Sequence, residues 1–376
     1  MTLRPSYPYP IGETGSPEAA ALTGQPLALT GATMVVPTLE EAEEAIGPEL
    51  RPGQGNVLSV KALSVDLLER SDRLTVVREA SLEIGPREIV GLIGESGGGK
   101  SVFWRSLFGL LRGANWRVAG EAFLMGKPLN FTDEEASRKS RGREVGIVPQ
   151  DPMGSFDPVR TIWNHFLETA QAHVDIPAQE IRAMAEDSLA KLYVDNPGRI
   201  LDSYPFQCSG GTLQRAMVAI SAMLGPALLI ADEPTTSVDV TVRLEVLSLL
   251  KSLRERIGTS LLLISHDLKA VMSVADELNV MYGGYIVERI KTGDLVAGKA
   301  QHPYAKKLIK ARPRFSRERL ESIPGAPPSL RERQGERCPF LPRCDQSRPS
   351  CSDYAMEAFR VGQGHFVRCL LAKGEA

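Results

Sequence analysis

The stretch GESGGGKS, residues 94–101, constrains the fold of this chain more than any other feature. It fits the pattern G-x-x-x-x-G-K-[ST], follows the apolar run EIVGLI and precedes VFWRSLFGLL, which has helical spacing. A strand, a glycine-rich turn and a helix N-terminus in this order form a cradle whose backbone N–H groups meet a phosphate. The sequence therefore predicts a nucleotide phosphate site rather than a glycine-rich turn without a ligand.

The residues of this cradle have separate predicted roles. Lys100 is expected to reach the β- and γ-phosphates, and the Ser101 hydroxyl is expected to bind Mg²⁺. Kinases, GTPases and motors all use such a cradle, so it does not select one activity. The predicted nucleotide-binding residues of the loop are Gly94, Glu95, Ser96, Gly97, Gly98, Gly99, Lys100 and Ser101.

An adjacent pair of carboxylates follows another apolar run, in ALLIADEP. Asp232 is placed at the carboxyl end of a buried strand, where it can hold the Mg²⁺ shell. Glu233 beside it can polarise the water that attacks the γ-phosphate. Such a pair can also serve only to solvate a strand end, but four apolar residues before it in a chain with this cradle favour the catalytic interpretation.

Short apolar runs alternate with helical stretches along the middle of the chain. REIVGLIG, REVGIVPQ, ALLIADE and SLLLISHD are typical of buried strands, and VLSVKALSVDL of a strand that precedes them. This alternation predicts a largely parallel α/β sheet. ELNVMYGGYIVER predicts a hairpin at the edge of that core, and helical spacing over about 152–215 predicts an inserted helical subdomain.

Composition defines the ends of the chain and excludes some classes of protein. Residues 1–55 are rich in Pro, Gly, Ala and Thr and predict a flexible extension. A formal net charge of −2 without a long basic run argues against a nucleic-acid binder. No stretch approaches eighteen apolar residues, and no export signal is visible at the N-terminus, so we expect a cytosolic protein with reduced thiols.

Three further motifs, QCSGGTLQR, TTSVDV and LISHD, follow the cradle in order. With them, residues 56–295 resemble the ATP-binding subunits of ABC transporters. The resemblance implies a P-loop NTPase core of the ABC ATPase type, with an antiparallel β edge and a C-terminal cysteine-rich extension over 296–376. The residues that match the family's motifs are Gln150 of the Q-loop, Ser209, Gly210 and Gly211 of the signature, Asp239 of the D-loop and the switch histidine His266.

The resemblance also implies which of these residues act on this chain's own ATP and which act on the ATP of a partner. In ABC proteins ATP is bound between two ATPase domains arranged head to tail, so Ser209 and Gly211 would act on the ATP of a partner. Gln150, Glu233 and His266 would act catalytically on this chain's own ATP. Mg²⁺ would be held by Ser101, Gln150 and Asp232. Because the chain has one P-loop, the second ATPase domain would come from another chain.

The sequence departs from the family's pattern at three positions. The signature begins with Cys208 where Leu is usual, and its fifth position is Thr212 where Gln is usual. The family stacks an aromatic residue on adenine about thirty positions before the P-loop lysine, and the matching position here is Leu67. Apolar packing by Leu67 is the expected replacement for stacking.

Segments beyond the ATPase motifs indicate a type of transporter. QDPMGSFDPV, QHPYAKKLIKARP and IPGAPPSL resemble segments of dipeptide and oligopeptide permease (Dpp/Opp) ATPases. The resemblance implies a peripheral subunit at the cytoplasmic face of the inner membrane. Its partners would be a second ATPase chain, two transmembrane permease subunits, which residues 151–160 would contact, and an extracytoplasmic substrate-binding protein. Peptides are the expected cargo, with nickel complexes, glutathione, opines and oligosaccharides as alternatives.

Two functions from other classes agree less well with the sequence. Non-transport ABC ATPases of DNA repair or translation usually carry a long coiled-coil insertion or two cassettes, whereas this chain has one cassette. Its Q-loop and signature are also close together, at Gln150 and Ser209. A small-molecule P-loop kinase would lack the signature and the switch histidine.

Four of the five cysteines lie in the tail, at Cys338, Cys344, Cys351 and Cys369. Reduced thiols gathered in this way favour metal ligation over disulfides. Structural zinc usually takes more closely spaced cysteine pairs, whereas cubane clusters take four thiolates from more widely spaced loops. The prediction is a [4Fe-4S] cluster, with zinc and then free thiols as alternatives, and the peptide-importer family, some of whose members hold such a cluster, agrees with it.

Overall fold

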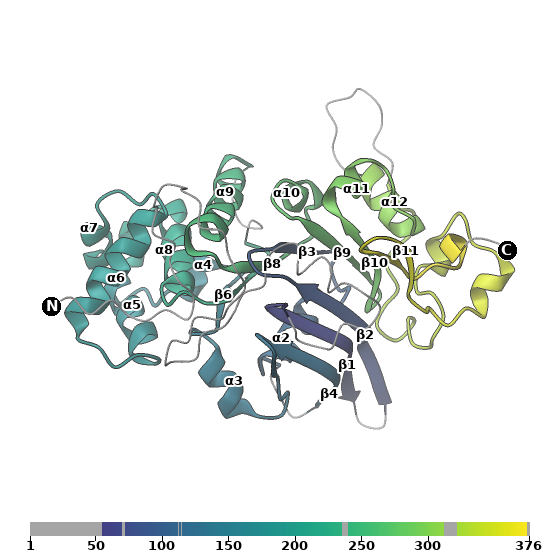
Figure 1. Cartoon of the computed structure of the whole chain (residues 1–376), viewed down its shortest axis with the longest axis horizontal. Coiled ribbons are helices and arrows are strands. Elements are labelled where there is room, and N and C mark those ends of the chain that lie inside the picture. The colour runs from purple at the N-terminus through teal and green to yellow at the C-terminus, as the bar shows by residue number, and fades with distance from the viewer. Residues whose placement is uncertain are drawn as a thin grey trace, which may run out of the picture.

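The computed structural model describes residues 55–69, 72–111, 113, 115–234, 240–311 and 322–373. Figure 1 shows a central body of sheet, a group of helices on one side and the C-terminal segments on the other. The predicted N-terminal extension, except for Gly55, lies outside the described residues. In the described ranges no helix is long and apolar enough to cross a membrane.

The core is an eight-stranded sheet in the order β11-β12-β10-β9-β3-β8-β7-β6. Strands β9, β3, β8, β7 and β6 run parallel, and β9, β10, β12 and β11 are antiparallel neighbours. The strands are β3 (Ile89–Ile93), β6 (Val145–Val148), β7 (Leu228–Asp232), β8 (Ser260–Ser265), β9 (Glu277–Tyr282), β10 (Tyr285–Lys291), β11 (Phe359–Gly362) and β12 (His365–Val367).

Strands β3, β6, β7 and β8 are almost entirely apolar because both of their faces are buried. In β3, Ile89 and Ile93 belong to one core cluster, with helices α8, α9 and α10. Val90 and Leu92 point to the opposite cluster, with α2 and a second sheet. Successive side chains of a strand point to opposite faces, so one apolar strand contributes to the core clusters on both sides of the sheet.

The second sheet is antiparallel, in the order β2-β1-β4-β5, and covers the face on which α2 lies. The sequence predicts its first strand but not the other three. The elements of this layer are β1 (Leu58–Glu69), β2 (Asp72–Ile84), α2 (Lys100–Leu107), β4 (Trp116–Leu124), β5 (Lys127–Pro128) and α3 (Glu134–Ser140).

The predicted helical insertion lies between β6 and β7. Its last helix extends beyond the predicted limit at residue 215, because apolar side chains of α8 remain buried to Ala222. The helices are α4 (Pro152–Ser155), α5 (Ile162–Gln171), α6 (Ala178–Lys191), α7 (Pro197–Asp202), the 3₁₀ turn η1 (Pro205–Gln207) and α8 (Gly210–Ala222).

The remaining helices cover the sheet or belong to the C-terminal extension. The 3₁₀ turns η2, η3 and η4 lie in the C-terminal extension, which also carries four of the cysteines. These elements are α9 (Val240–Ile257), α10 (Leu268–Met272), α11 (Thr292–Val296), α12 (Pro303–Lys310), η2 (Leu341–Arg343), η3 (Pro349–Ser352) and η4 (Leu370–Lys373).

The hairpin β9–β10 forms as predicted, in the antiparallel edge of the sheet. Glu288 and Arg289 of β10 pair with Val367 and Phe366 of β12, so the extension adds two strands to the core. The predicted antiparallel edge is confirmed, and it is longer than the hairpin because β12, more than seventy residues later in the chain, pairs with the free side of β10. The extension is therefore part of the same sheet as the P-loop strand β3.

Candidate functional site

The glycine-rich loop between β3 and α2 is held against the end of β9. Gly94 has φ +155°, and a Cβ at this position would lie 2.1 Å from the carbonyl oxygen of Met281. Gly99, which caps α2, has φ +105°, a conformation that side chains other than glycine's rarely adopt. These glycines allow the backbone to turn closely enough to present its N–H groups at the start of α2.

Lys100 lies inside this loop and is 5% exposed. Its ammonium donates hydrogen bonds to the carbonyl oxygens of Gly94 at 2.8 Å and Glu95 at 3.1 Å. Burial lowers the pKa of Lys100, whereas the negative charges of Glu233, Asp232 and Glu95 act to raise it. A buried cation beside the N-terminus of a helix is a site suited to an anion.

Asp232 is 2% exposed at the end of β7 and accepts hydrogen bonds from two residues of α2. Ser101 Oγ is 3.3 Å from one carboxylate oxygen, and Trp104 Nε1 is 3.0 Å from the other. Arg105 lies 3.5 Å from the same oxygen as Trp104. Burial raises the pKa of Asp232, and the hydrogen bond from Trp104, the charge of Arg105 and the hydrogen bond from Ser101 oppose that rise.

Glu233 is the point at which three predicted catalytic residues meet. Gln150 Nε2 donates to Glu233 Oε2 at 3.2 Å, and His266 Nδ1 lies 3.3 Å from the same oxygen. Glu233 itself has φ +51°, in the left-handed region of backbone conformation. Left-handed backbone at a residue other than glycine costs free energy and is concentrated at functional sites.

The signature residues lie at the start of α8. Ser209 caps this helix: its Oγ accepts from the N–H of Thr212 at 3.2 Å and is 2.8 Å from the Thr212 hydroxyl. A Cβ at Gly211 would meet no atom within 4 Å, so the helix N-terminus is open to a close approach. The departure at Thr212 therefore gives the signature serine a hydroxyl partner within its own helix.

Leu67 and Asp239 complete the predicted site, and their roles, like those of the residues above, stay predictions. Leu67 lies in β1, half-buried, in register with Leu74 and Trp116 on the neighbouring strands. Its contact with adenine stays a prediction. Asp239 of the predicted D-loop lies outside the described residues.

Several residues at the site were missed by the sequence analysis. Trp104 follows Lys100 by one helical turn, and this i, i+4 spacing could have indicated that it faces the same side of α2. Tyr304 and Arg343, from the C-terminal extension, contact Glu95 of the P-loop. No local signal in the sequence could have indicated these contacts, because they join residues more than two hundred positions apart.

Comparison with known proteins identifies the family. A protein of Brucella abortus, named for peptide import and ATP binding, is 38% identical over 299 residues, which cover 78% of this chain and 89% of that protein. The chain belongs to the family of ABC transporter ATP-binding proteins. The oligopeptide transport ATP-binding protein AmiE of Streptococcus pneumoniae is 35% identical over 325 residues, covering 85% of this chain and 90% of AmiE.

Family models divide this ABC ATPase into two parts. Residues 77–236 match the ABC transporter model, and residues 287–351 match the model of the oligopeptide/dipeptide transporter C-terminal region. The ATP-binding cassette MJ0796, solved as a dimer with ADP and phosphate, has a TM-score of 0.55 at 22% identity and covers 62% of this chain and 98% of its own. The protein cbiO1 from Clostridium perfringens has a TM-score of 0.56, also at 22% identity, and covers 65% and 92%. These structures confirm the ABC ATPase fold.

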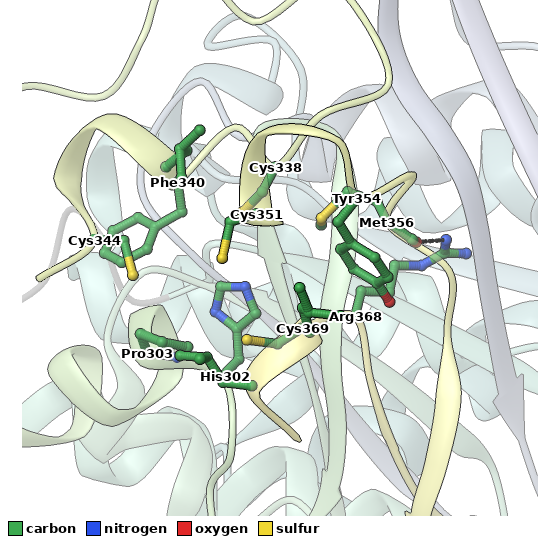
Figure 2. Close-up of a pocket in the computed structure, with 13 residues that line it drawn as sticks. His302, Pro303, Cys338, Phe340, Cys344, Cys351, Tyr354, Met356, Arg368 and Cys369 are labelled. Atoms are coloured by element: carbon green, nitrogen blue, oxygen red, sulfur yellow. Dashed lines mark hydrogen bonds between the residues drawn. The ribbon is translucent and has the colours of Figure 1, made fainter. Parts of the chain in front are cut away.

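The four tail cysteines line one pocket of the extension. Figure 2 shows their side chains around this pocket, together with His302. The other lining residues are mostly apolar, and no set of three or more Cys, His, Asp or Glu side chains in the described ranges is grouped closely enough to hold a metal ion. Burial raises the pKa of Cys338 to about 12 and also raises the pKa of Cys344 and Cys369.

His302 is a neutral member of this pocket. Its Nδ1 accepts a hydrogen bond from the backbone N–H of Tyr304 at 3.1 Å. Burial lowers the pKa of His302 to about 3. Because Nδ1 is an acceptor, the proton of the neutral ring lies on Nε2.

The hydrogen bond from Trp104 to Asp232 predicts an effect on Mg²⁺ dependence. Trp104→Phe removes the N–H donor and keeps an aromatic ring, so the carboxylate loses one of the groups that orient it. A hydrogen bond to a charged group contributes about 1.5 kcal/mol. We therefore expect the Mg²⁺ concentration for half-maximal ATPase activity to rise about three- to tenfold.

The matched control is Trp163→Phe on α5, where the ring lies under the Arg182 guanidinium, 5.6 Å away. This control should leave the Mg²⁺ titration of ATPase activity unchanged. A Trp104→Phe protein with the wild-type Mg²⁺ titration would show that the indole does not orient Asp232 for this purpose.

Proposed function

We propose that this ABC ATPase powers the import of peptides through a Dpp/Opp-type transporter. The single observation that carries the proposal is the presence of both family regions in one chain, the ATPase motifs and the oligopeptide/dipeptide transporter C-terminal region. The names of the relatives, which refer to peptide or oligopeptide transport, support the same cargo. Nickel complexes, glutathione, opines and oligosaccharides are the alternative cargoes, and the transporter's binding protein selects among them.

Within the site, we assign hydrolysis to the group around Glu233. Its carboxylate would accept a hydrogen bond from the attacking water and polarise it toward the γ-phosphate. Gln150 and His266, which both lie against Glu233 Oε2, would fix the orientation of that carboxylate. Lys100 would pair with the β- and γ-phosphates from the position in which the two loop carbonyls hold its ammonium.

The donor set for Mg²⁺ consists of Ser101, Asp232 and Gln150. A hydroxyl, a carboxylate and a side-chain amide supply the oxygen ligands that Mg²⁺ prefers. Bound Mg²⁺ would neutralise charge on the β- and γ-phosphates. Ser101 and Asp232 are already hydrogen-bonded to each other, which supports their assignment to one ion.

The signature residues Ser209, Gly210 and Gly211 would act on the ATP of a second ATPase chain. The open space at Gly211 and the cap formed by Ser209 support a close approach to a γ-phosphate bound elsewhere. Asp239 would act at the same dimer contact. The partner ATPase would in turn cap the nucleotide bound here, so that two chains make two composite sites.

Membrane coupling is assigned to residues 151–160. Helix α4 lies in this segment, and Val159 near its end is 78% exposed. The support for this assignment is the resemblance of the segment to the one that peptide-importer ATPases use against their membrane subunit. The full assembly would contain two permease subunits and an extracytoplasmic binding protein, with this chain at the cytoplasmic face of the inner membrane.

We propose a [4Fe-4S] cluster for the pocket of Cys338, Cys344, Cys351 and Cys369. Four thiols on one largely apolar pocket are the donor set that such a cluster requires, and zinc is the alternative. The raised pKa values of three of them mean that metal binding would release protons. Binding would draw the sulfur atoms into a tighter group, and the role of the cluster would be structural.

The assignment of Glu233 predicts a specific defect. Glu233→Gln keeps the P-loop and the size of the side chain but removes the group that polarises water. We expect ATP hydrolysis by the assembled complex to fall at least about a hundredfold while ATP binding persists and a closed ATPase dimer accumulates. Lys100→Ala should instead weaken nucleotide binding itself. ATP hydrolysis at the wild-type rate by the Glu233→Gln complex would contradict the assignment of Glu233 as the residue that polarises water.

The cysteine pocket predicts an iron-containing protein. After anaerobic purification the full chain should be brown, absorb broadly at roughly 400 nm and contain about four irons. Cys344→Ser should lose iron, whereas Cys208→Ser, at a cysteine that does not line the pocket, should retain it. Colourless protein with one zinc per chain would favour the zinc alternative and contradict the cluster.

A further inference from the structure

Three side chains of the C-terminal extension contact the P-loop. Tyr304 Oη accepts a hydrogen bond from the backbone N–H of Glu95 at 2.9 Å. Arg333 donates to the carbonyl oxygen of Gly97 at 2.8 Å. Arg343 holds the Glu95 carboxylate through both of its terminal nitrogens, at 2.6 and 3.2 Å. The P-loop is therefore held by three residues that lie outside the region matched by the ABC transporter model.

Arg343 is well fixed in this position. Its side chain is 5% exposed, and it also donates to the Tyr282 hydroxyl at 3.1 Å and to the carbonyl oxygen of Pro324 at 2.8 Å. A two-point contact between a guanidinium and a carboxylate sets the relative orientation of both groups as well as their distance. A buried charge that loses its partner is strongly disfavoured, so this pair is unlike a surface ion pair.

The segment that carries Arg343 begins and ends at cysteines of the pocket, Cys338 and Cys344. Within it, Phe340 is buried with its ring 5.2 Å from that of Tyr282 and 5.4 Å from that of Tyr304. The same short segment therefore lines the cysteine pocket and reaches the P-loop. Figure 2 shows Phe340 beside the cysteines.

We infer that the C-terminal extension positions the P-loop for nucleotide. Arg343 of the segment 338–344 and Tyr304 of α12 are the positioning residues, and both act through Glu95. The carbonyl oxygen of Glu95 accepts from the Lys100 ammonium at 3.1 Å and from the N–H of Gly98 at 3.2 Å. Holding the side chain and the N–H of Glu95 therefore fixes the carbonyl that orients the phosphate-binding lysine. Losing this hold should weaken nucleotide binding.

The test measures the dissociation constant of MgADP, which is bound without hydrolysis, for the full-length chain by calorimetry. Arg343→Gln and Tyr304→Phe should each raise this constant, with Arg343→Gln raising it about fivefold or more, the range of typical coupling between sites. Arg360→Gln is the matched control, because Arg360 is exposed in the same extension and donates to Gly362 of its own hairpin. This control should bind MgADP as the wild type does.

A double-mutant cycle separates this role from general destabilisation. Arg343→Gln and Glu95→Gln remove the same contact, so the double variant should bind MgADP about as weakly as either single variant. If the double variant raised the MgADP dissociation constant by the product of the two single effects, the inference would be overturned. A folded Arg343→Gln protein with wild-type affinity for MgADP would also overturn it. If Arg343→Gln does not fold, Tyr304→Phe decides, because it removes only one hydroxyl, and wild-type affinity in that variant would overturn it.

The cysteine pocket should be coupled to nucleotide through the same segment. Cys344→Ala should weaken MgADP binding in the wild-type background and have no further effect in the Arg343→Gln background. An equal effect in both backgrounds, or none in the wild type, would show that Arg343 does not carry the coupling. This part rests on the pocket described above, but it does not depend on which metal occupies it, because metal content is measured separately.

Discussion

The ammonium of Lys100 is buried in the P-loop, where it donates to the carbonyl oxygens of Gly94 and Glu95. These two hydrogen bonds hold the cation at the start of α2 and keep the loop in its turned shape. The remaining parts of the ATP site are placed relative to it: Ser101 follows Lys100 on the helix, and Asp232 accepts from Ser101 across the sheet. The loop can keep this shape because the sheet supports it at Gly94 and the extension supports it at Glu95.

In the proposed assembly, the described part of the chain would be one half of a composite ATPase. The groups expected to act on its own nucleotide are joined by hydrogen bonds, in the pair Ser101–Asp232 and around Glu233. Ser209, by contrast, makes its hydrogen bonds within α8. The hydroxyl of Thr212 takes part in that local arrangement. The replacement of the usual glutamine by Thr212 therefore adds a hydroxyl contact to the signature serine.

The sequence predicted the core well, because the core depends on local patterns. Continuous apolar runs such as that around Val90 indicate strands buried on both faces, and the glycines of the P-loop indicate its turn. The contact between Arg343 and Glu95 could not be predicted, because the two residues are 248 positions apart and the sequence near either one does not indicate the other. The two strands that extend the antiparallel edge beyond the hairpin could not be predicted for the same reason, since β12 is a short strand defined by its pairing with β10.

Amide hydrogen exchange over residues 94–101 in the nucleotide-free, full-length chain tests the central claim that the P-loop is formed before nucleotide binds. Hydrogen bonds of the loop, such as that from the N–H of Gly98 to the carbonyl oxygen of Glu95, protect it in the structure. The account predicts exchange well below that of an unstructured peptide, and faster exchange in Arg343→Gln than in the wild type. Exchange in the wild type as fast as in an unstructured peptide would contradict it.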